Sequence, residues 1–233
     1  MPPTILIVVT LLTVGFVFFM RPRRFYFVRH GETLLNAAQI KQGAEGKLSE
    51  LGKQQVAKIG ELFAPLAIKK IISSPYERAR ETSEIINKKL GVSIIYTSLL
   101  SERRNPSALV GKSMHDPEVT RAIDQTDLAY HDDDYRYADE ENFQDLKVRA
   151  KKCLGYLART GSTQNCVVTH HAFLKMLLSY MLYRKALHSP DFIKLSFFNA
   201  ADNGGISVCE FHPWKFFSKT HGWEIVSYNE QPG

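Results

Sequence analysis

The residues best suited to chemistry lie in one short segment, Arg29-His30-Gly31-Glu32-Thr33, directly after the apolar residues 25–28. Those apolar residues predict a buried strand, and open α/β sheets bind ligands at the carboxyl ends of their strands. A guanidinium binds phosphate oxygens in bidentate fashion, and an imidazole is a nucleophile at neutral pH. Gly31 allows a tight turn and a close approach to a small anion. The segment therefore predicts chemistry on a phosphoryl group.

Two later positions have the same character. Arg78 lies in the first turn of a helix that is predicted to begin at Pro75 and to end before Gly91, and His170 follows a buried strand predicted at residues 165–169. Together with the first pair they can surround one anion. Two arginines would neutralise phosphoryl oxygens, one imidazole would attack phosphorus, and the other would donate hydrogen bonds as charge develops.

The remaining patterns predict the elements that must hold these residues. Residues 98–140 lack clean periodicity and carry many charges, so we interpret them as an inserted cap or flap over the site. Helices are predicted at 49–66 (with Ser49 as N-cap), 75–90, 142–158 and 171–182, and further strands at 68–73, 92–96, 194–198, 206–211 and 223–228. The alternation of strands and helices predicts an α/β fold with a mostly parallel sheet.

Length and charge exclude other classes of protein. The chain has 233 residues and a net charge of +6, of which Arg21, Arg23 and Arg24 supply half. No stripe of lysine and arginine with interleaved aromatic residues is present, so nucleic acid is not an expected partner. The three cysteines, Cys153, Cys166 and Cys209, are odd in number and lack metal-ligand spacing, which indicates a reducing compartment.

The first twenty residues form a separate segment. Residues 4–20 carry no charge and, as a helix, would extend about 26 Å, close to the thickness of a hydrocarbon core. The arginines follow this run rather than precede it, which disfavours a signal peptide. The pattern predicts one N-terminal transmembrane anchor at residues 1–22 and a single domain at 23–233. The positive flank predicts a single-pass membrane protein with that domain on the cytoplasmic side.

Several motifs together resemble the histidine phosphatase superfamily, branch 1, from Arg24 to the end of the chain. They are VRHGETLLN at 28–36, QG at 42–43, LSELG at 48–52, SSPYERARET at 73–82, LLSER at 99–103 and VVTHH at 167–171. The resemblance implies a phosphoglycerate mutase-like fold, a three-layer α/β/α sandwich. It requires no metal and no other cofactor.

The resemblance also implies roles for the candidate residues. His30 would be the nucleophile that becomes a phosphohistidine, and Arg29, Arg78 and His170 would form the phosphate pocket. Glu102 matches the acid that protonates the leaving oxygen; as a solvated loop residue it would instead pair with a neighbouring arginine.

Further substrate contacts are expected around this pocket. Asn36 is a candidate phosphate contact, although capping of a helix or turn explains it equally well, and Thr33 is a weaker candidate. The other candidates for substrate binding are Gln42, Gly43, Arg103, Arg104 and His171.

Two departures from the family pattern bear on function. His171 stands where the family usually has glycine, and the segment after Glu102 lacks the ERHYG pattern of cofactor-dependent mutases. We therefore expect a membrane-anchored phosphomonoesterase that works through a phosphohistidine, with the lipid bilayer as partner of residues 4–20. The alternatives are a phosphatase of phosphohistidine or phosphotyrosine proteins, a phosphoglycerate-type mutase and an inactive phosphate-binding scaffold. The substrate is then a phosphorylated small molecule or a phosphoprotein.

Overall fold

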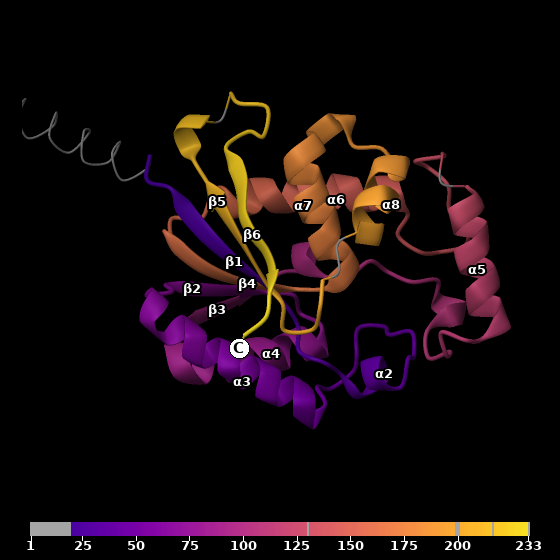
Figure 1. Cartoon of the computed structure of the whole chain (residues 1–233), viewed down its shortest axis with the longest axis horizontal. Coiled ribbons are helices and arrows are strands. Elements are labelled where there is room, and N and C mark those ends of the chain that lie inside the picture. The colour runs from indigo at the N-terminus through magenta and orange to yellow at the C-terminus, as the bar shows by residue number, and fades with distance from the viewer. Residues whose placement is uncertain (1–19, 130, 199–200, 216, 233) are drawn as a thin grey trace, which may run out of the picture.

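The computed structural model describes residues 20–129, 131–198, 201–215 and 217–232 (Figure 1). The predicted membrane anchor lies almost wholly outside these residues, so it stays a prediction. Within the described part of the chain, no helix is both long and apolar enough to cross a membrane.

A central sheet positions the candidate residues. Among the described residues it has six strands in the order β3-β2-β4-β1-β5-β6. The strands β3, β2, β4 and β1 are parallel, whereas β5 and β6 are antiparallel to their neighbours. The sheet is therefore mostly parallel, as predicted. Their bounds are β1 Arg23–Arg29, β2 Lys70–Ser73, β3 Ser93–Tyr96, β4 Gln164–Thr169, β5 Ile206–Phe211 and β6 Trp223–Glu230.

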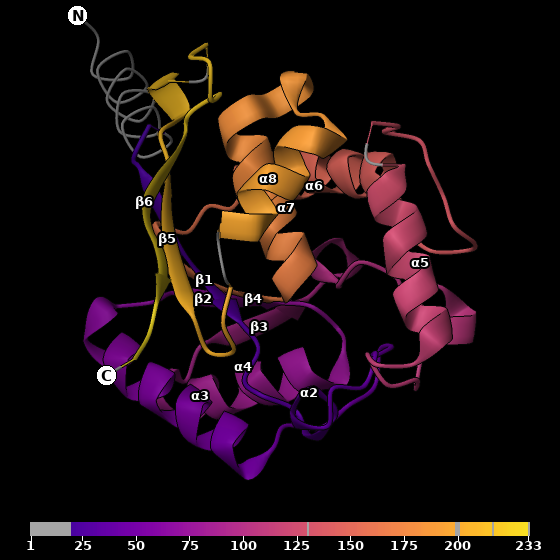
Figure 2. The same ribbon diagram turned by 45° about the vertical axis from the view of Figure 1, so that its right-hand side comes forward.

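Helices cover both faces of the sheet (Figures 1 and 2). In β1, Phe25 and Phe27 pack with α6 and α7 on one face, while Tyr26 and Val28 pack with α3 and α4 on the other. This alternation follows from the two-residue period of a strand that is buried on both sides. The predicted three-layer architecture is therefore observed. The helices are α2 Leu34–Ala37, α3 Glu50–Phe63, α4 Glu77–Leu90, α5 Pro117–Leu128, α6 Phe143–Leu157, α7 His171–Tyr183 and α8 Ser189–Phe198.

The helix signals in the sequence were reliable, but one predicted strand is wrong. Ser49 caps α3 by accepting a hydrogen bond from the Gly52 amide at 3.0 Å, and Gly91 ends α4 in the left-handed region at φ 63°. Residues 194–198, predicted as a strand, belong to α8 instead. The preceding Ser189-Pro190-Asp191 is a helix-start signal, and Phe192 packs on the core below α7, which favours the helix over local β propensity.

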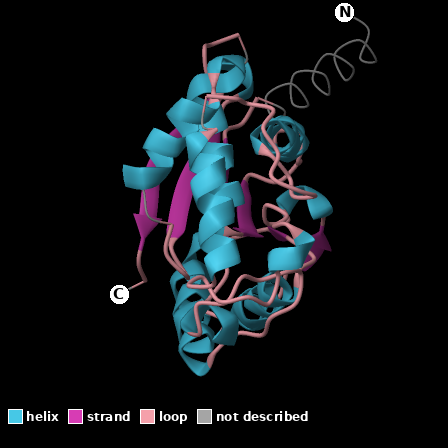
Figure 3. Ribbon diagram, turned by 90° about the vertical axis from the view of Figure 1, so that its right-hand side faces the viewer, coloured by secondary structure: helices cyan, strands magenta, loops and turns pink. Residues whose placement is uncertain are grey.

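The predicted flap lies beside the sheet rather than within it. Its longest element is α5, which begins with Asp116 as N-cap and Pro117 in the first turn. Leu109, Val119 and Ala122 form a small cluster that is separate from the two cores of the sheet. Viewed from the side that carries α5, helices and loops stand in front of the sheet (Figure 3).

Candidate active site

The four predicted phosphate residues meet at one edge of the sheet. Arg29 and His30 lie at the end of β1, His170 follows β4, and Arg78 is in the first turn of α4, just after β2. Because β2, β4 and β1 are parallel neighbours, their carboxyl ends lie side by side. The rings of His30 and His170 are 5.1 Å apart, centroid to centroid. All four side chains therefore belong to one site.

Two contacts determine the tautomer of His30. Its Nδ1 lies 2.8 Å from the carbonyl oxygen of Gly31, which can only accept, so Nδ1 carries the proton. The Nε of Arg78 donates to Nε2 of His30 at 3.2 Å, so Nε2 carries the lone pair. Burial, followed by the positive charges of Arg78 and Arg29, holds the pKa of His30 well below its usual range. His30 is therefore a neutral imidazole with a defined basic nitrogen.

His170 is held by a hydroxyl group. Its Nε2 lies 2.7 Å from Oγ of Ser74, and its Nδ1 is buried with no hydrogen-bond partner within the described chain. Burial and the charge of Arg78 lower the pKa of His170 as well. An unpartnered buried polar atom is costly unless a ligand satisfies it. Nδ1 of His170 is thus available to a bound anion.

The two arginines are fixed by backbone carbonyls. Arg29 donates to the carbonyl of Ala201 at 2.6 Å, and Arg78 donates to that of Gly43 at 2.9 Å. Burial lowers the pKa of both guanidinium groups, and the charge of Glu102 opposes this effect. The Nε of Arg29 is buried and has no hydrogen-bond partner among the described residues. These two cations create a site of strong positive potential that an anion would neutralise.

Close packing holds the His30 loop against α3 and α4. A Cβ on Gly52 would lie 2.0 Å from the carbonyl oxygen of Glu32, and one on Gly31 would lie 2.6 Å from that of Gly52. The amide of Gly31 donates to Oγ1 of Thr82 at 3.2 Å, and Thr82 donates to the carbonyl of Arg78 at 2.7 Å. The motifs around positions 31, 52 and 82 therefore fix the loop that carries the nucleophile.

Glu102, in the loop after β3, places its carboxylate at the N-terminus of α7. Its carboxylate accepts from the amides of Arg103 at 2.8 Å, Ala172 at 3.2 Å and Phe173 at 3.0 Å. A carboxylate is favourable there because the first amides of a helix lack internal partners. The alternative expectation, in which Glu102 pairs with the side chain of Arg103 or Arg104, is not observed. Glu102 is a part of the site that is joined to α7.

Arg149 of α6 supports the segment that carries Glu102, and the sequence analysis missed it. It donates to the carbonyl of Ser101 at 2.7 Å and to that of Leu99 at 3.2 Å, and forms an ion pair with Glu141 at 2.5 Å. Its guanidinium also stacks on Phe173, 4.0 Å from the ring centroid. Arg149 thereby ties the Glu102 segment to both α6 and α7. The one signal in the sequence was the position of Arg149 beside the apolar face of the predicted helix 142–158.

Asn36 and Thr33 form a cap, as the structural alternative predicted. Thr33 is the N-cap of α2; its Oγ1 accepts from the Asn36 amide at 2.9 Å, and the Asn36 side chain bonds back to Thr33. Asn203, which the sequence analysis also missed, donates to the His30 carbonyl at 3.0 Å and to Oδ1 of Asn36 at 3.4 Å. These residues therefore lie next to the site, and a phosphate contact from Asn36 stays a prediction.

Of the remaining candidates, Gln42 and Gly43 contact neighbouring side chains through their carbonyls, and Arg103 and Arg104 line a pocket. Gly43 contacts Arg78 through its carbonyl, and the Gln42 carbonyl accepts from Asn105 at 3.1 Å. Arg103 and Arg104 line a pocket of about 150 Å³ between this segment and α5, together with Lys41. Burial and the charge of Arg103 lower the pKa of Lys41. The lining of this pocket combines these cations with the acids Asp127 and Glu140.

His171, the departure from the family pattern, is directed to the backbone. Its Nδ1 lies 2.9 Å from the carbonyl of Ala201, the same oxygen to which Arg29 donates. Burial lowers the pKa of His171, and the charge of Arg29 adds to the effect. The extra imidazole therefore helps to fix the segment beside Arg29, and a contact with substrate stays a prediction.

The sequence matches the model of a known protein family. The model of the histidine phosphatase superfamily (branch 1) matches residues 25–224, most of the chain. This chain belongs to that superfamily. Among curated relatives, the probable phosphoglycerate mutase GpmB of Erwinia tasmaniensis is 30% identical over 159 residues, which cover 67% of this chain and 74% of the relative.

Solved structures share the fold. A mycobacterial glucosyl-3-phosphoglycerate phosphatase superposes with a TM-score of 0.73 at 20% identity and covers 91% of this chain and 100% of its own. The alpha-ribazole phosphatase of Shigella flexneri gives 0.68 at 19% identity, with 89% and 96% covered. The family and the fold support a phosphate-ester hydrolase or mutase.

Proposed function

We propose that this protein is a phosphomonoesterase that works through a phosphohistidine at His30. The observation that carries the proposal is the tautomer of His30, whose Nε2 holds a lone pair in a pocket lined by two arginines and His170. Arg29, Arg78 and Nδ1 of His170 would hold the three outer phosphoryl oxygens. Such preorganised donors stabilise the transition state without reorganisation at the moment of reaction.

The reaction would take place in two steps, transfer of the phosphoryl group to His30 and then its transfer to water. Nε2 of His30 attacks phosphorus, the bond to the ester oxygen breaks, and the leaving oxygen takes a proton from Glu102. Water then attacks phosphorus and gives its proton to the Glu102 carboxylate, the bond between phosphorus and Nε2 of His30 breaks, and inorganic phosphate is released. The charge of Glu102 acts on both Arg29 and Arg78, so its carboxyl group lies close to the pocket in which the reaction would occur.

We favour hydrolysis over mutase chemistry because the nearby cations are engaged elsewhere. Arg104 donates to the Asp139 carbonyl at 3.0 Å, Lys112 pairs with Glu118, and Nε of Arg103 donates to the Glu141 carbonyl at 2.9 Å. A mutase must hold a bisphosphorylated intermediate while it reorients, which needs cations free to contact it. The kinship with GpmB keeps the mutase as the second candidate.

We infer that the substrate is a phosphorylated small molecule. The pocket beside the site holds about 150 Å³ and combines Lys41 with apolar residues such as Leu109 of the flap. Such a pocket suits the remainder of a small phosphate ester better than a protein surface. The glucosyl-3-phosphoglycerate and alpha-ribazole phosphatases, by their names, act on small molecules.

We also propose that residues 4–20 anchor the protein in a membrane, with the domain on the cytoplasmic side. The support is the sequence alone, an uncharged apolar run followed by Arg21, Arg23 and Arg24.

The test of the chemistry is hydrolysis of p-nitrophenyl phosphate by the full chain, with EDTA present and absent. We expect phosphate release in both conditions and a loss of at least about a thousandfold in His30→Ala. Acid-labile phosphate trapped on the wild-type protein, and absent from the variant, would identify the intermediate. Equal activity of wild type and His30→Ala would refute the proposed nucleophile.

A further inference from the structure

The loop between β5 and β6 exposes large aromatic side chains. Phe217 is 97% exposed and Trp214 is 50% exposed. Burying such side chains is favourable, so an aromatic side chain this exposed can still gain from a partner that removes it from water. Lys215 and Lys219 lie on the same loop and are also exposed. Aromatic and cationic residues thus alternate over a few positions.

The end of α7 continues this surface. Leu182 is 52% and Tyr183 is 43% exposed, and Lys185 follows in the next turn. Leu182 of α7 and Ile225 of β6 line one pocket, which places the end of α7 beside the start of β6, where the β5–β6 loop ends. We call this surface the hairpin face; it comprises Leu182, Tyr183, Lys185, Trp214, Lys215, Phe217 and Lys219.

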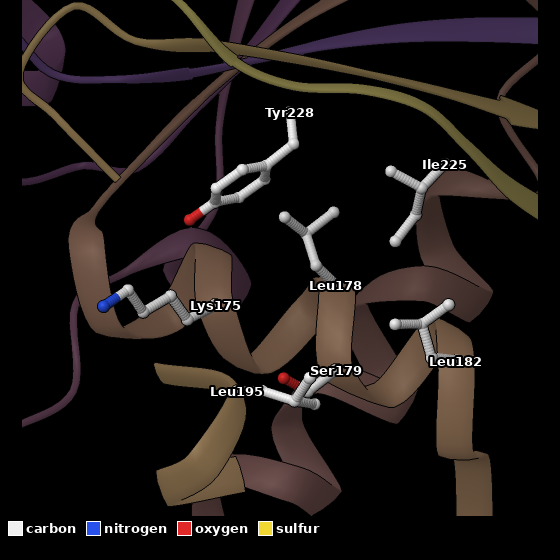
Figure 4. Close-up of a pocket in the computed structure, with 7 residues that line it drawn as sticks. All are labelled: Lys175, Leu178, Ser179, Leu182, Leu195, Ile225 and Tyr228. Carbon is white, nitrogen blue, oxygen red and sulfur yellow. The ribbon is translucent and has the colours of Figure 1, made fainter. Parts of the chain in front are cut away.

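An apolar groove opens from the hairpin face. Leu182 lines it together with Leu178, Leu195 and Ile225, and Lys175 and Tyr228 lie at its other end (Figure 4). The groove is therefore an apolar extension of the same surface.

The charge of this region is positive. Glu224 pairs with Lys215 at 3.2 Å, and Glu210 accepts from Arg24 at 2.8 Å, so both acids are neutralised by neighbours. Lys185 and Lys219 add positive charge to the hairpin face, and Arg21 adds it where the chain enters β1. A surface of this kind attracts an anionic partner.

The hairpin face lies at the end of the molecule where the chain enters the domain. Arg23, the first residue of β1, pairs with Phe211, the last residue of β5, directly before the loop. In Figures 1 and 2 this end lies opposite α3. The uncharged residues 4–20 precede β1 by only two residues. A partner that binds residues 4–20 would therefore lie close to the hairpin face.

We propose that the hairpin face lies on an anionic lipid bilayer, with Trp214 and Phe217 in the interfacial region. Aromatic side chains are favoured at the level of the headgroups, and lysines bind anionic lipids beside them. This surface goes beyond the proposed anchor because it assigns a lipid contact to the folded domain. It is independent of the phosphatase chemistry.

The experiment uses tryptophan as the reporter. The full chain is reconstituted into vesicles of phosphatidylserine and phosphatidylcholine with brominated acyl chains, which quench tryptophan on contact. The only other tryptophan, Trp223, is buried in the core against Phe25. We expect quenching in wild type, a loss of that quenched component in Trp214→Phe, and no recovery when Leu51→Trp is added to Trp214→Phe. Leu51 is an exposed residue at the start of α3, so it is a matched site at the opposite end.

Each outcome decides the proposal. Quenching that depends on Trp214 and weakens in Lys185→Glu/Lys219→Glu supports it. Flotation of the protein with vesicles after an alkaline wash, without quenching of Trp214, keeps the anchor and overturns the hairpin face. Failure to float overturns both. Hydrolysis of p-nitrophenyl phosphate by the same sample tests the enzymatic proposal separately, and circular dichroism confirms that each variant is folded.

Discussion

The phosphate site and the flap differ in how their residues are held. His30, Arg78 and His170 are each at most 3% exposed, and each has a partner on another element of the sheet scaffold. In α5 only Val119 and Ala122 are buried, and they pack within the flap. The first region is fixed by the core of the domain, whereas the second has a small core of its own.

This difference separates chemistry from selectivity. Attack on phosphorus requires groups that are held in place before the substrate arrives, and the strand ends provide that rigidity. Apart from Glu102, which belongs to the phosphate site, the flap faces what lies beyond the phosphoryl group, through the pocket that Leu109 and Ala122 share with Lys41. We expect mutations in the first region to change the rate of the chemical step, and mutations in the flap to change substrate binding.

The largest effect is expected where the two regions are joined. Arg149 and Glu141 form an ion pair with side chains only 17% and 14% exposed. Arg149→Met leaves the Glu141 carboxylate buried and unpaired, so the free energy of unfolding should fall by about 3–5 kcal/mol. Denaturant unfolding followed by circular dichroism measures this loss.

The double variant Arg149→Met/Glu141→Leu is the control for that prediction. Replacing both members of a buried pair is often neutral, so most of the stability should return. Activity should stay low, because the carbonyls of Leu99 and Ser101 still lack their donor. Recovery of full activity would mean that Arg149 only stabilises the fold and does not position Glu102.

Glu102→Gln tests the acid within the phosphate site. Glutamine keeps the size of the side chain and one oxygen to accept from the first amides of α7, but it has no proton to give. With an alkyl phosphate, whose leaving group needs that proton, kcat should fall by about a hundredfold. With p-nitrophenyl phosphate, whose leaving group needs none, the fall in phosphohistidine formation should be much smaller. If the rate of phosphohistidine formation falls equally with both substrates, Glu102 is not the acid.

The buried histidines predict a pH dependence of stability. His30 and His170 have a pKa below the ordinary value of 6.5, so the unfolded chain binds more protons than the folded chain as the pH falls past 6.5. Their contribution to stability is therefore complete above that value and is lost at lower pH. His170→Asn should flatten this dependence in urea unfolding at a series of pH values. An unchanged slope would show that other groups cause the acid sensitivity.

The same contrast explains what the sequence could predict. Arg29, His30, Arg78 and His170 each adjoin a clear strand or helix signal, so local patterns were enough to place them together. Asn203 and Arg149 contact residues 173 and 48 positions away, respectively, and no local pattern encodes such pairs. Residues 194–198 of α8 were predicted as a strand because their aromatic residues favour either state, and the packing of α8 against α7 decides between them. The helix α5 was missed because most of the flap lacks a periodic apolar face.

The smallest expected effect tests the independence of the flap. Val119→Ala removes two methyl groups from the small cluster with Leu109 and Ala122, and Val167→Ala makes the same change in a core of the sheet; both side chains are fully buried. Each substitution should lower the free energy of unfolding of the part of the molecule that it affects by about 1–2 kcal/mol. The Val167 variant should lose this in global unfolding. The Val119 variant should lose it mainly in faster hydrogen exchange of α5 amides and in a higher KM, with kcat nearly unchanged. If both variants lower the global unfolding midpoint equally, the flap is part of one cooperative unit, and its cluster supports the phosphate site as well.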